Sequence, residues 1–216
     1  MIDDVLDVDL DGTVLAFWRD RLALHTRDTY KGRTLAKMPE DLRTYQHVIE
    51  RTRPDLIIEL GTYDGGSALW FADQLQVLCD VQGLSVITVE KHPRVKIEDP
   101  RVLEYRGVDL ADKGVIDEIG YLAANRRVMV VEDSAHTYES TLAALNGYGE
   151  MVSLDCYFVV EDGVVDEPRL TIWNGGGVQP AITDFLNTEL GSRFSRHELA
   201  PYGLTTDHHG WLRAGG

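Results

Sequence analysis

The stretch DLIIELGTYDGGS, residues 55–67, passes from a short apolar run into a glycine-rich turn and then into an apolar segment. Because the run is too short for a helix and rich in isoleucine and leucine, it predicts a buried strand of a parallel sheet. The same alternation continues along the chain and indicates βαβ crossovers. We expect strands at 55–60, 85–90, 101–105, 127–132 and 154–161, with helices at 66–79, 111–124 and 137–150 between them.

The C-terminal part completes the expected fold. A last helix near 178–190 precedes two short strands at 193–199 and 204–212. A strand pair after five alternating units suggests a seven-stranded, mostly parallel sheet whose last strand is antiparallel. This is an α/β, Rossmann-like pattern with helices on both faces, and by analogy it is the methyltransferase variant of that architecture. Toward the N-terminus, residues 13–25 have a loosely helical pattern, and Pro39 begins a helix.

The composition is that of one soluble globular domain: 216 residues, 44% hydrophobic and 26% charged. A net charge of -15 argues against nucleic acid and against anionic membrane surfaces as partners. The two cysteines, Cys79 and Cys156, have no CxxC spacing, and no apolar run approaches the ~20 residues of a membrane span. The acidic N-terminus is the opposite of a secretory signal, so we expect a cytoplasmic protein.

The glycine-rich turn contains Gly61, Gly65 and Gly66. A dinucleotide fingerprint requires GxGxxG, with its second glycine where Tyr63 stands, and a bulky side chain there obstructs a pyrophosphate. NAD is therefore disfavoured, whereas S-adenosylmethionine has no phosphate. Glu90 ends the second strand, where an acid can accept both ribose hydroxyls of an adenosyl ligand. Asp109 follows the third strand and either contacts the adenosyl ligand or caps the next helix.

Acidic residues follow two further strands, in Asp133-Ser-Ala-His136 and in the pair Glu161-Asp162. The carboxyl ends of parallel strands meet at the edge where α/β sheets bind ligands. Carboxylates select Mg²⁺, or Mn²⁺ or Ca²⁺, over zinc, and an imidazole suits a general base. The alternatives are that Asp133 or Ser134 caps a helix and that Glu161-Asp162 is an exposed turn. Clustered acids raise one another's pKa unless a cation is near, which also indicates one.

Three other histidines are weaker candidates for a site. His92 follows Glu90 in the loop before Pro93. His208 and His209 lie in the final strand pair, where we expect surface or packing roles.

Several motifs together resemble the cephalosporin-hydroxylase-like family, which has the class I S-adenosylmethionine-dependent methyltransferase fold. The sequence is similar to macrolide-sugar and rhamnosyl O-methyltransferases, and the resemblance implies a role in antibiotic or other natural-product biosynthesis. The match runs from about residue 30 onward. It rests on KMPEDL (37–42), RPDLIIELGTYDGGS (53–67), DSAH (133–136), VVED (159–162) and TTDHHGWLR (205–213).

The resemblance implies roles for individual residues. Asp133, Glu161 and Asp162 are expected to hold Mg²⁺, with His136 as general base. Glu59, Gly61, Ser67 and Glu90 are expected around the cofactor. Together with the glycine-turn analysis, the expected cofactor-binding set is Glu59, Gly61, Tyr63, Gly65, Ser67, Glu90, Asp109 and Asp133.

The expected function is Mg²⁺-dependent methyl transfer from S-adenosylmethionine to a hydroxyl of a sugar or another small natural product. The resemblance also implies a homo-oligomer. We expect residues 1–50 to form a helical cap and oligomerisation segment, and 51–216 to form the cofactor-binding domain. Two alternatives stay open: an NAD-dependent oxidoreductase on the same fold, and a non-catalytic adenosyl-binding protein.

Overall fold

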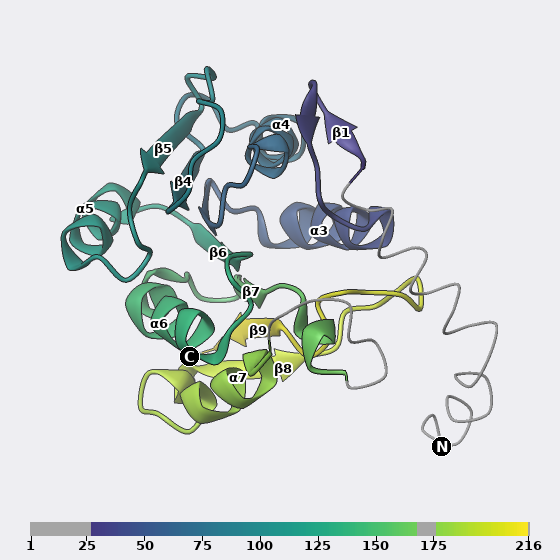
Figure 1. Cartoon of the computed structure of the whole chain (residues 1–216), viewed down its shortest axis with the longest axis vertical. Helices are drawn as coiled ribbons and strands as arrows, with labels where there is room; N and C mark the ends of the chain where they lie inside the picture. Colours follow the sequence, from purple (N-terminus) through teal and green to yellow (C-terminus); the bar gives the residue numbers. More distant parts are fainter. Residues whose placement is uncertain (1–26, 168–175, 216) are drawn as a thin grey trace.

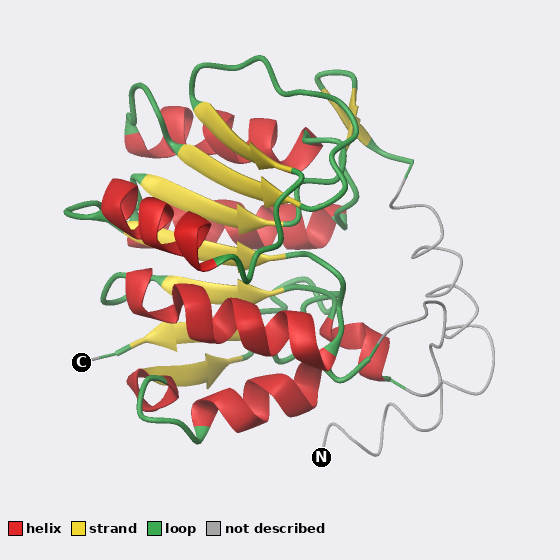
Figure 2. Ribbon diagram, turned by 60° about the vertical axis from the view of Figure 1, so that its left-hand side comes forward, coloured by secondary structure: helices red, strands yellow, loops and turns green. Residues whose placement is uncertain are grey.

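A seven-stranded sheet forms the centre of the computed structural model, and helices cover both of its faces (Figures 1 and 2). The structure describes residues 27–167 and 176–215. The sheet strands are β3 Leu56–Leu60, β4 Val86–Glu90, β5 Val102–Arg106, β6 Val128–Glu132, β7 Tyr157–Val160, β8 Phe194–His197 and β9 Trp211–Ala214. The helices are α3 Pro39–Thr52, α4 Gly66–Cys79, α5 Lys113–Ala123, α6 Tyr138–Tyr148 and α7 Val178–Leu186.

The strand order is β5-β4-β3-β6-β7-β9-β8. The pairs from β5 to β7 are parallel, whereas β9 runs antiparallel between β7 and β8. The predicted sheet, with its last strand antiparallel, is therefore confirmed. Each of the first five predicted strands lies within three residues of its predicted start, since burial on both faces gives continuous apolar runs.

Two apolar layers hold the sheet between its helices. On one face Ile57, Met129 and Val131 pack with side chains of α3 and α4. On the other face Ile58 and Val130 pack with α5, α6 and α7. Alternate residues of one strand thus enter different layers, as the two-residue repeat of a strand requires. Figure 1 shows α3 and α4 on one side of the sheet and the other three helices opposite.

The structure differs from the sequence-based expectations near the chain's turns. The predicted strand at 204–212 begins only at Trp211, because the preceding residues form turns in which Gly210 N donates to Asp207 O at 3.0 Å. Before Pro39 the chain forms a short hairpin, β1 Thr29–Tyr30 and β2 Arg33–Thr34. The predicted helix at 13–25 lies outside the described residues.

The predicted division after residue 50 falls inside α3, whose side chains share a core layer with the sheet. Cys79 and Cys156 are both free thiols. Within the described ranges no helix combines the length and apolar character that crossing a membrane requires.

Strand register places the candidate site. Leu60, Glu132 and Val160 pair across neighbouring strands at one level. The residues that follow them, Gly61, Asp133 and Glu161, therefore leave the sheet side by side. Gly61 has a φ of +105°, and a Cβ atom there would lie 1.9 Å from Asp133 O. The close approach of the two strand ends thus requires glycine at position 61.

Replacing Gly61 with alanine should lower the free energy of unfolding by roughly 2–4 kcal/mol, because it combines a left-handed backbone with a steric clash. Gly32→Ala is the matched control, since Gly32 also has a positive φ, +74°, but nothing lies within 4 Å of a Cβ there. It should cost only about 1 kcal/mol. Chemical denaturation measures both, and equal losses would contradict the clash.

Candidate functional site

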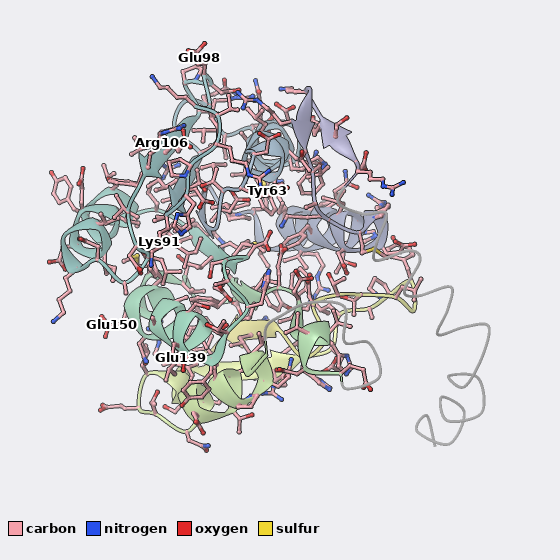
Figure 3. All side chains as sticks on the ribbon, in the orientation of Figure 1. Tyr63, Lys91, Glu98, Arg106, Glu139 and Glu150 are labelled. Carbon is pink, nitrogen blue, oxygen red and sulfur yellow. The ribbon has the colours of Figure 1, made fainter. Side chains whose placement is uncertain are left out.

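A cavity of about 820 Å³ opens at the carboxyl ends of the parallel strands. Its walls include Gly61 and Glu90 on one side and Asp133, His136 and Asp162 on the other. Figure 3 labels three further wall residues, Tyr63, Lys91 and Glu139. A second cavity, of about 640 Å³, lies at the opposite edge of the sheet and contains none of the predicted site residues.

The glycine turn is bound to the end of β4 through Glu90. One carboxylate oxygen accepts hydrogen bonds from Thr62 N at 3.1 Å and Tyr63 N at 2.8 Å. The other accepts from His92 N at 2.7 Å. Glu90 thus shapes both loops of the cavity wall and still faces the cavity. Tyr63 is 43% exposed, and the guanidinium of Arg94 lies 4.0 Å from its ring centroid.

Asp109 also lines the cavity and does not cap α5. Its carboxylate accepts from Lys91 Nζ at 2.8 Å and from Ala111 N at 3.0 Å. The hydrogen bond from Lys91 is the main cause that lowers the pKa of Asp109. The cap of α5 is Asp112, which accepts from Val115 N. The structure therefore excludes the capping role expected for Asp109 and places this residue beside the cavity.

Three of the predicted cofactor residues lie behind the cavity wall and do not line it. Glu59 is fully buried and accepts from Thr88 Oγ1 at 3.0 Å. Burial raises the pKa of Glu59 to about 7, and the hydroxyl of Ser67 partly offsets that effect. Gly65 precedes α4, and a side chain there would meet Ile97. Glu59, Gly65 and Ser67 therefore support the glycine turn from the interior.

His136 and two carboxylates form a compact group on the cavity wall. His136 Nε2 lies 3.2 Å from Asp162 Oδ2 and 3.7 Å from Asp133 Oδ1. The three side chains each offer one ligand atom within 4.8 Å of the others, which is compatible with one metal ion. The Nδ1 atom of His136 is buried without a hydrogen-bond partner. Burial disfavours the imidazolium, but Asp162 and Asp133 outweigh it and raise the pKa of His136.

Three residues of this wall lie in the left-handed backbone region. Tyr63, His136 and Asp162 have φ values of 48°, 52° and 54°. Such a conformation costs roughly 1–2 kcal/mol for a residue with a Cβ atom, and it is found where function fixes a side chain's direction.

Glu161 has a different environment from its neighbour Asp162. It is only 4% exposed, and its oxygens lie 2.6 and 2.7 Å from Lys37 Nζ. Tyr45 donates its hydroxyl to Glu161 at 2.6 Å. Burial and the charge of Asp133 raise the pKa of Glu161 to about 7, against the opposite effect of Lys37. Glu161 is therefore paired with Lys37 and Tyr45 in this structure, and its role as a metal ligand stays a prediction.

Lys37 belongs to this group of charges, and the sequence analysis assigned it no role. Its ammonium bridges Glu161 to Asp133, whose Oδ2 lies 2.8 Å away. Burial works against the charge of Lys37, yet Asp133 and Glu161 hold its pKa well above the usual value. The cation that clustered acids were expected to need is thus supplied, in this structure, by the chain itself. The sequence signal for a buried charge was a lysine whose neighbours, Ala36 and Met38, are apolar.

Neither Asp133 nor Ser134 caps a helix, and Glu161-Asp162 is not an exposed turn, so both alternatives from the sequence analysis are wrong. The cap of α6 is Thr137, which forms a capping box with Ser140. Ser134 instead bonds to the buried Glu132 through both its amide, at 3.1 Å, and its hydroxyl. Glu161 is buried, so the pair Glu161-Asp162 is not an exposed turn.

A second buried acid pair lies behind Glu161. Thr206 donates from its amide and its hydroxyl to Asp41 Oδ2, each at 3.0 Å, and its hydroxyl also contacts Asp207 at 3.2 Å. Burial raises the pKa of Asp41 to about 6 and that of Asp207 well above its usual value. The final loop of the chain is thereby tied to α3 beneath the site.

The strand order and the acid-lined cavity define the class: a Rossmann-like protein with the class I methyltransferase fold. The family model of Rhamnosyl O-methyltransferase/CmcI matches residues 23–214, and the chain belongs to that family. The family resemblance predicted from the motifs is thus confirmed.

Sequence relatives and solved structures agree with this assignment. Rhamnosyl O-methyltransferase of Mycobacterium tuberculosis (strain ATCC 25618 / H37Rv) is 30% identical over 164 residues, which are 73% of this chain and 65% of the relative. The chain thus spans about 65% of that relative's length. Rhamnosyl O-methyltransferase of Mycobacterium leprae (strain TN) is 25% identical over 190 residues, 85% of this chain and 82% of the relative.

The apo structure of CmcI superposes with a TM-score of 0.66 at 20% identity, over 88% of this chain and 77% of CmcI. MycE, from the mycinamycin biosynthetic pathway, gives a TM-score of 0.56 at 14% identity, over 80% of this chain and 49% of MycE. These structures share the fold.

Lys37→Met should lower the free energy of unfolding by about 3–5 kcal/mol, because it leaves Glu161 buried without its counter-ion. The double variant Lys37→Met/Glu161→Gln should recover most of that loss. Lys31→Met is the matched control, since Lys31 is 46% exposed in its pair with Asp73 and should change stability by less than ~1 kcal/mol. Urea denaturation checks all three. A double variant no more stable than Lys37→Met would contradict the coupling.

Proposed function

We propose that this protein transfers a methyl group from S-adenosylmethionine to a hydroxyl group on a sugar of a small natural product, with Mg²⁺ as the metal. The observation that carries the proposal is the group of His136, Asp133 and Asp162 on the wall of a cavity that also contains the glycine turn. This arrangement supports a base, a metal site and a nucleoside-binding loop within reach of one another.

The charge of the cavity suits S-adenosylmethionine. Its wall includes five acids, Glu90, Asp109, Asp133, Glu139 and Asp162. The cofactor has a positive sulfonium and an ammonium group, which such a wall attracts, whereas the phosphates of NAD would be repelled. The side chain of Tyr63 also stands where a dinucleotide fingerprint needs glycine. We propose that Glu90 binds the ribose hydroxyls and that Asp109 lies on the adenine side.

The donor set also fits a hard divalent cation. Asp133 and Asp162 present carboxylate oxygens to the cavity, the ligand type that Mg²⁺ prefers. Bound there, the cation would stabilise negative charge on the acceptor oxygen. Glu161 as a third ligand stays a prediction, since Lys37 and Tyr45 occupy its oxygens in this structure.

His136 is the group we propose for proton removal. Asp162 and Asp133 orient its Nε2 atom at the cavity wall. The acceptor hydroxyl would give its proton to the neutral imidazole while the oxygen bonds to the methyl carbon. The bond from carbon to sulfur breaks, and its electron pair stays on sulfur. The products are a methyl ether, S-adenosylhomocysteine and an imidazolium that returns its proton to solvent.

The comparisons support the choice of acceptor and metal. The sequence relatives are named for methylation of a rhamnosyl group. CmcI has been solved with Mg and SAM, and MycE with Mg, SAH and mycinamycin VI. We propose a hydroxylated, sugar-bearing acceptor by analogy with these proteins. Assembly into a homo-oligomer, with residues 1–50 contributing, stays a prediction.

His136→Ala should lower kcat by roughly 10²–10⁴-fold while changing the Kd for S-adenosylmethionine by no more than about twofold, since the base acts on the acceptor and not on the cofactor. Mass spectrometry of products from a panel of glycosylated acceptors measures turnover, and calorimetry measures binding. His47→Ala, which removes a hydrogen bond to Tyr202 away from the cavity, is the control. Full turnover after treatment with EDTA would show that the metal requirement is wrong. Binding of NAD in place of S-adenosylmethionine would favour the oxidoreductase.

The pKa of His136 should depend on the metal. Without Mg²⁺ the neighbouring carboxylates raise this pKa above its ordinary value of 6.5, so the imidazolium contributes stability that is full below pH 6.5 and is lost as the pH rises through the folded-state pKa. Mg²⁺ should lower the pKa, because it cancels the charges of Asp133 and Asp162. An NMR titration of the imidazole signals, assigned with His136→Ala, measures both. An unchanged pKa would place the metal elsewhere.

A further inference from the structure

A second cluster of metal-binding side chains lies between β8 and β9, outside the group of Asp133, His136 and Asp162. Glu198 directly follows β8, and His208 and His209 come shortly before β9. One ligand atom from each of the three lies within 4.8 Å of the other two. His209 Nδ1 contacts Glu198 Oε1, and the ring centroids of the two histidines are 3.8 Å apart. Two imidazoles and a carboxylate thus converge at one point.

The backbone explains why neighbouring histidines face the same point. Successive side chains of an extended segment point in opposite directions. His209 instead has a φ of 57°, which turns its ring toward that of His208. This conformation costs about 1 kcal/mol or more for a residue with a Cβ atom. The surface role expected for His208 and His209 does not explain why their rings face each other.

The segment that carries the two histidines is fixed on both sides. The carbonyl of His208 accepts from Gln179 Nε2 at 2.5 Å. It also packs against Gly163, where a Cβ atom would come within 2.2 Å of it. On the far side, Val160 N donates to Gly210 O at 2.9 Å. Because the backbone is held, closing the three side chains around an ion requires little rearrangement.

Glu198, 54% exposed at its side chain, supplies the negative charge of this group. Neutral imidazole and ionised carboxylate are the forms of these side chains that bind a metal ion.

We propose that Glu198, His208 and His209 form a second metal site, which takes Zn²⁺ or a similar borderline transition-metal ion. Two histidines and one glutamate are a recognised zinc ligand set that leaves a fourth position for water. Imidazole nitrogen selects such ions over Mg²⁺, whereas the two carboxylates on the cavity wall have the opposite preference. The two sites thus differ in the ion they select.

Occupation of this site would act on the loop beside the catalytic acids. The loop that contains His208 also contains Thr206, which bonds to Asp41, and Asp207, which contacts the amide of Asp162 at 3.4 Å. An ion that joins Glu198 to the two histidines closes this loop against β8. Zn²⁺ should therefore raise the thermal stability of the folded protein.

The test is calorimetric titration of Zn²⁺ into untagged, EDTA-stripped full-length protein, with excess Mg²⁺ present. The wild type should bind one Zn²⁺. The double variant His208→Ala/His209→Ala should bind it with an affinity roughly 100-fold or more lower. His197→Ala, on the strand residue next to Glu198, is the matched control and should keep wild-type affinity. Thermal unfolding without zinc shows whether each variant is folded. Glu198→Gln, at an exposed side chain, provides a second variant that should also weaken binding.

Electron paramagnetic resonance with Cu²⁺ identifies the ligands independently. The proposed site should show coupling to two imidazole nitrogens, whereas the cavity-wall group can supply only one, from His136. If the double histidine variant binds Zn²⁺ as tightly as the wild type, or if the copper signal shows a single nitrogen that His136→Ala removes, the proposed second site is wrong.

Discussion

The ammonium of Lys37, buried between Glu161 and Asp133, is the interaction on which the arrangement of the site depends. Strand register brings the acids at the ends of β6 and β7 side by side, where the negative charges of Asp133 and Glu161 repel each other. Lys37 comes from the segment between the β1–β2 hairpin and α3, so its charge also joins that part of the chain to the sheet edge. The hairpin contacts the glycine turn as well, through Thr34 N and Asp64 at 2.8 Å. Lys37 therefore both compensates the charges of the two acids and fixes the N-terminal part of the described chain to the sheet edge.

The acids at this edge fall into two groups with different tasks. Asp133 and Asp162 face the cavity and are available to a ligand. Glu161, Asp41 and Asp207 are buried, and their hydrogen bonds go to Lys37, Tyr45 and Thr206. Burial raises the pKa of each of these three, so they keep protons more readily than exposed acids do.

Much of the fold is encoded in local pattern, and the charge network is not. The bounds of α4 agree with the predicted 66–79, because a glycine turn before it and an apolar run within it are both local signals. DSAH and the Glu161-Asp162 pair likewise follow apolar strands that any parallel sheet aligns. Lys37 lies 96 residues from Asp133 and 124 from Glu161, so no spacing rule connects them. The sequence shows that a cation is needed, and only the three-dimensional structure shows which one the chain supplies.

The hydrogen bonds of Glu90 have a consequence for ligand exchange. An ionised carboxylate has about four lone-pair positions, and backbone amides of two loops already use three of them. A ligand with one hydroxyl can be added to the remaining position, whereas a vicinal diol must displace an amide. If both ribose hydroxyls bind Glu90 as proposed, one of these amide hydrogen bonds is exchanged for a bond to the ligand.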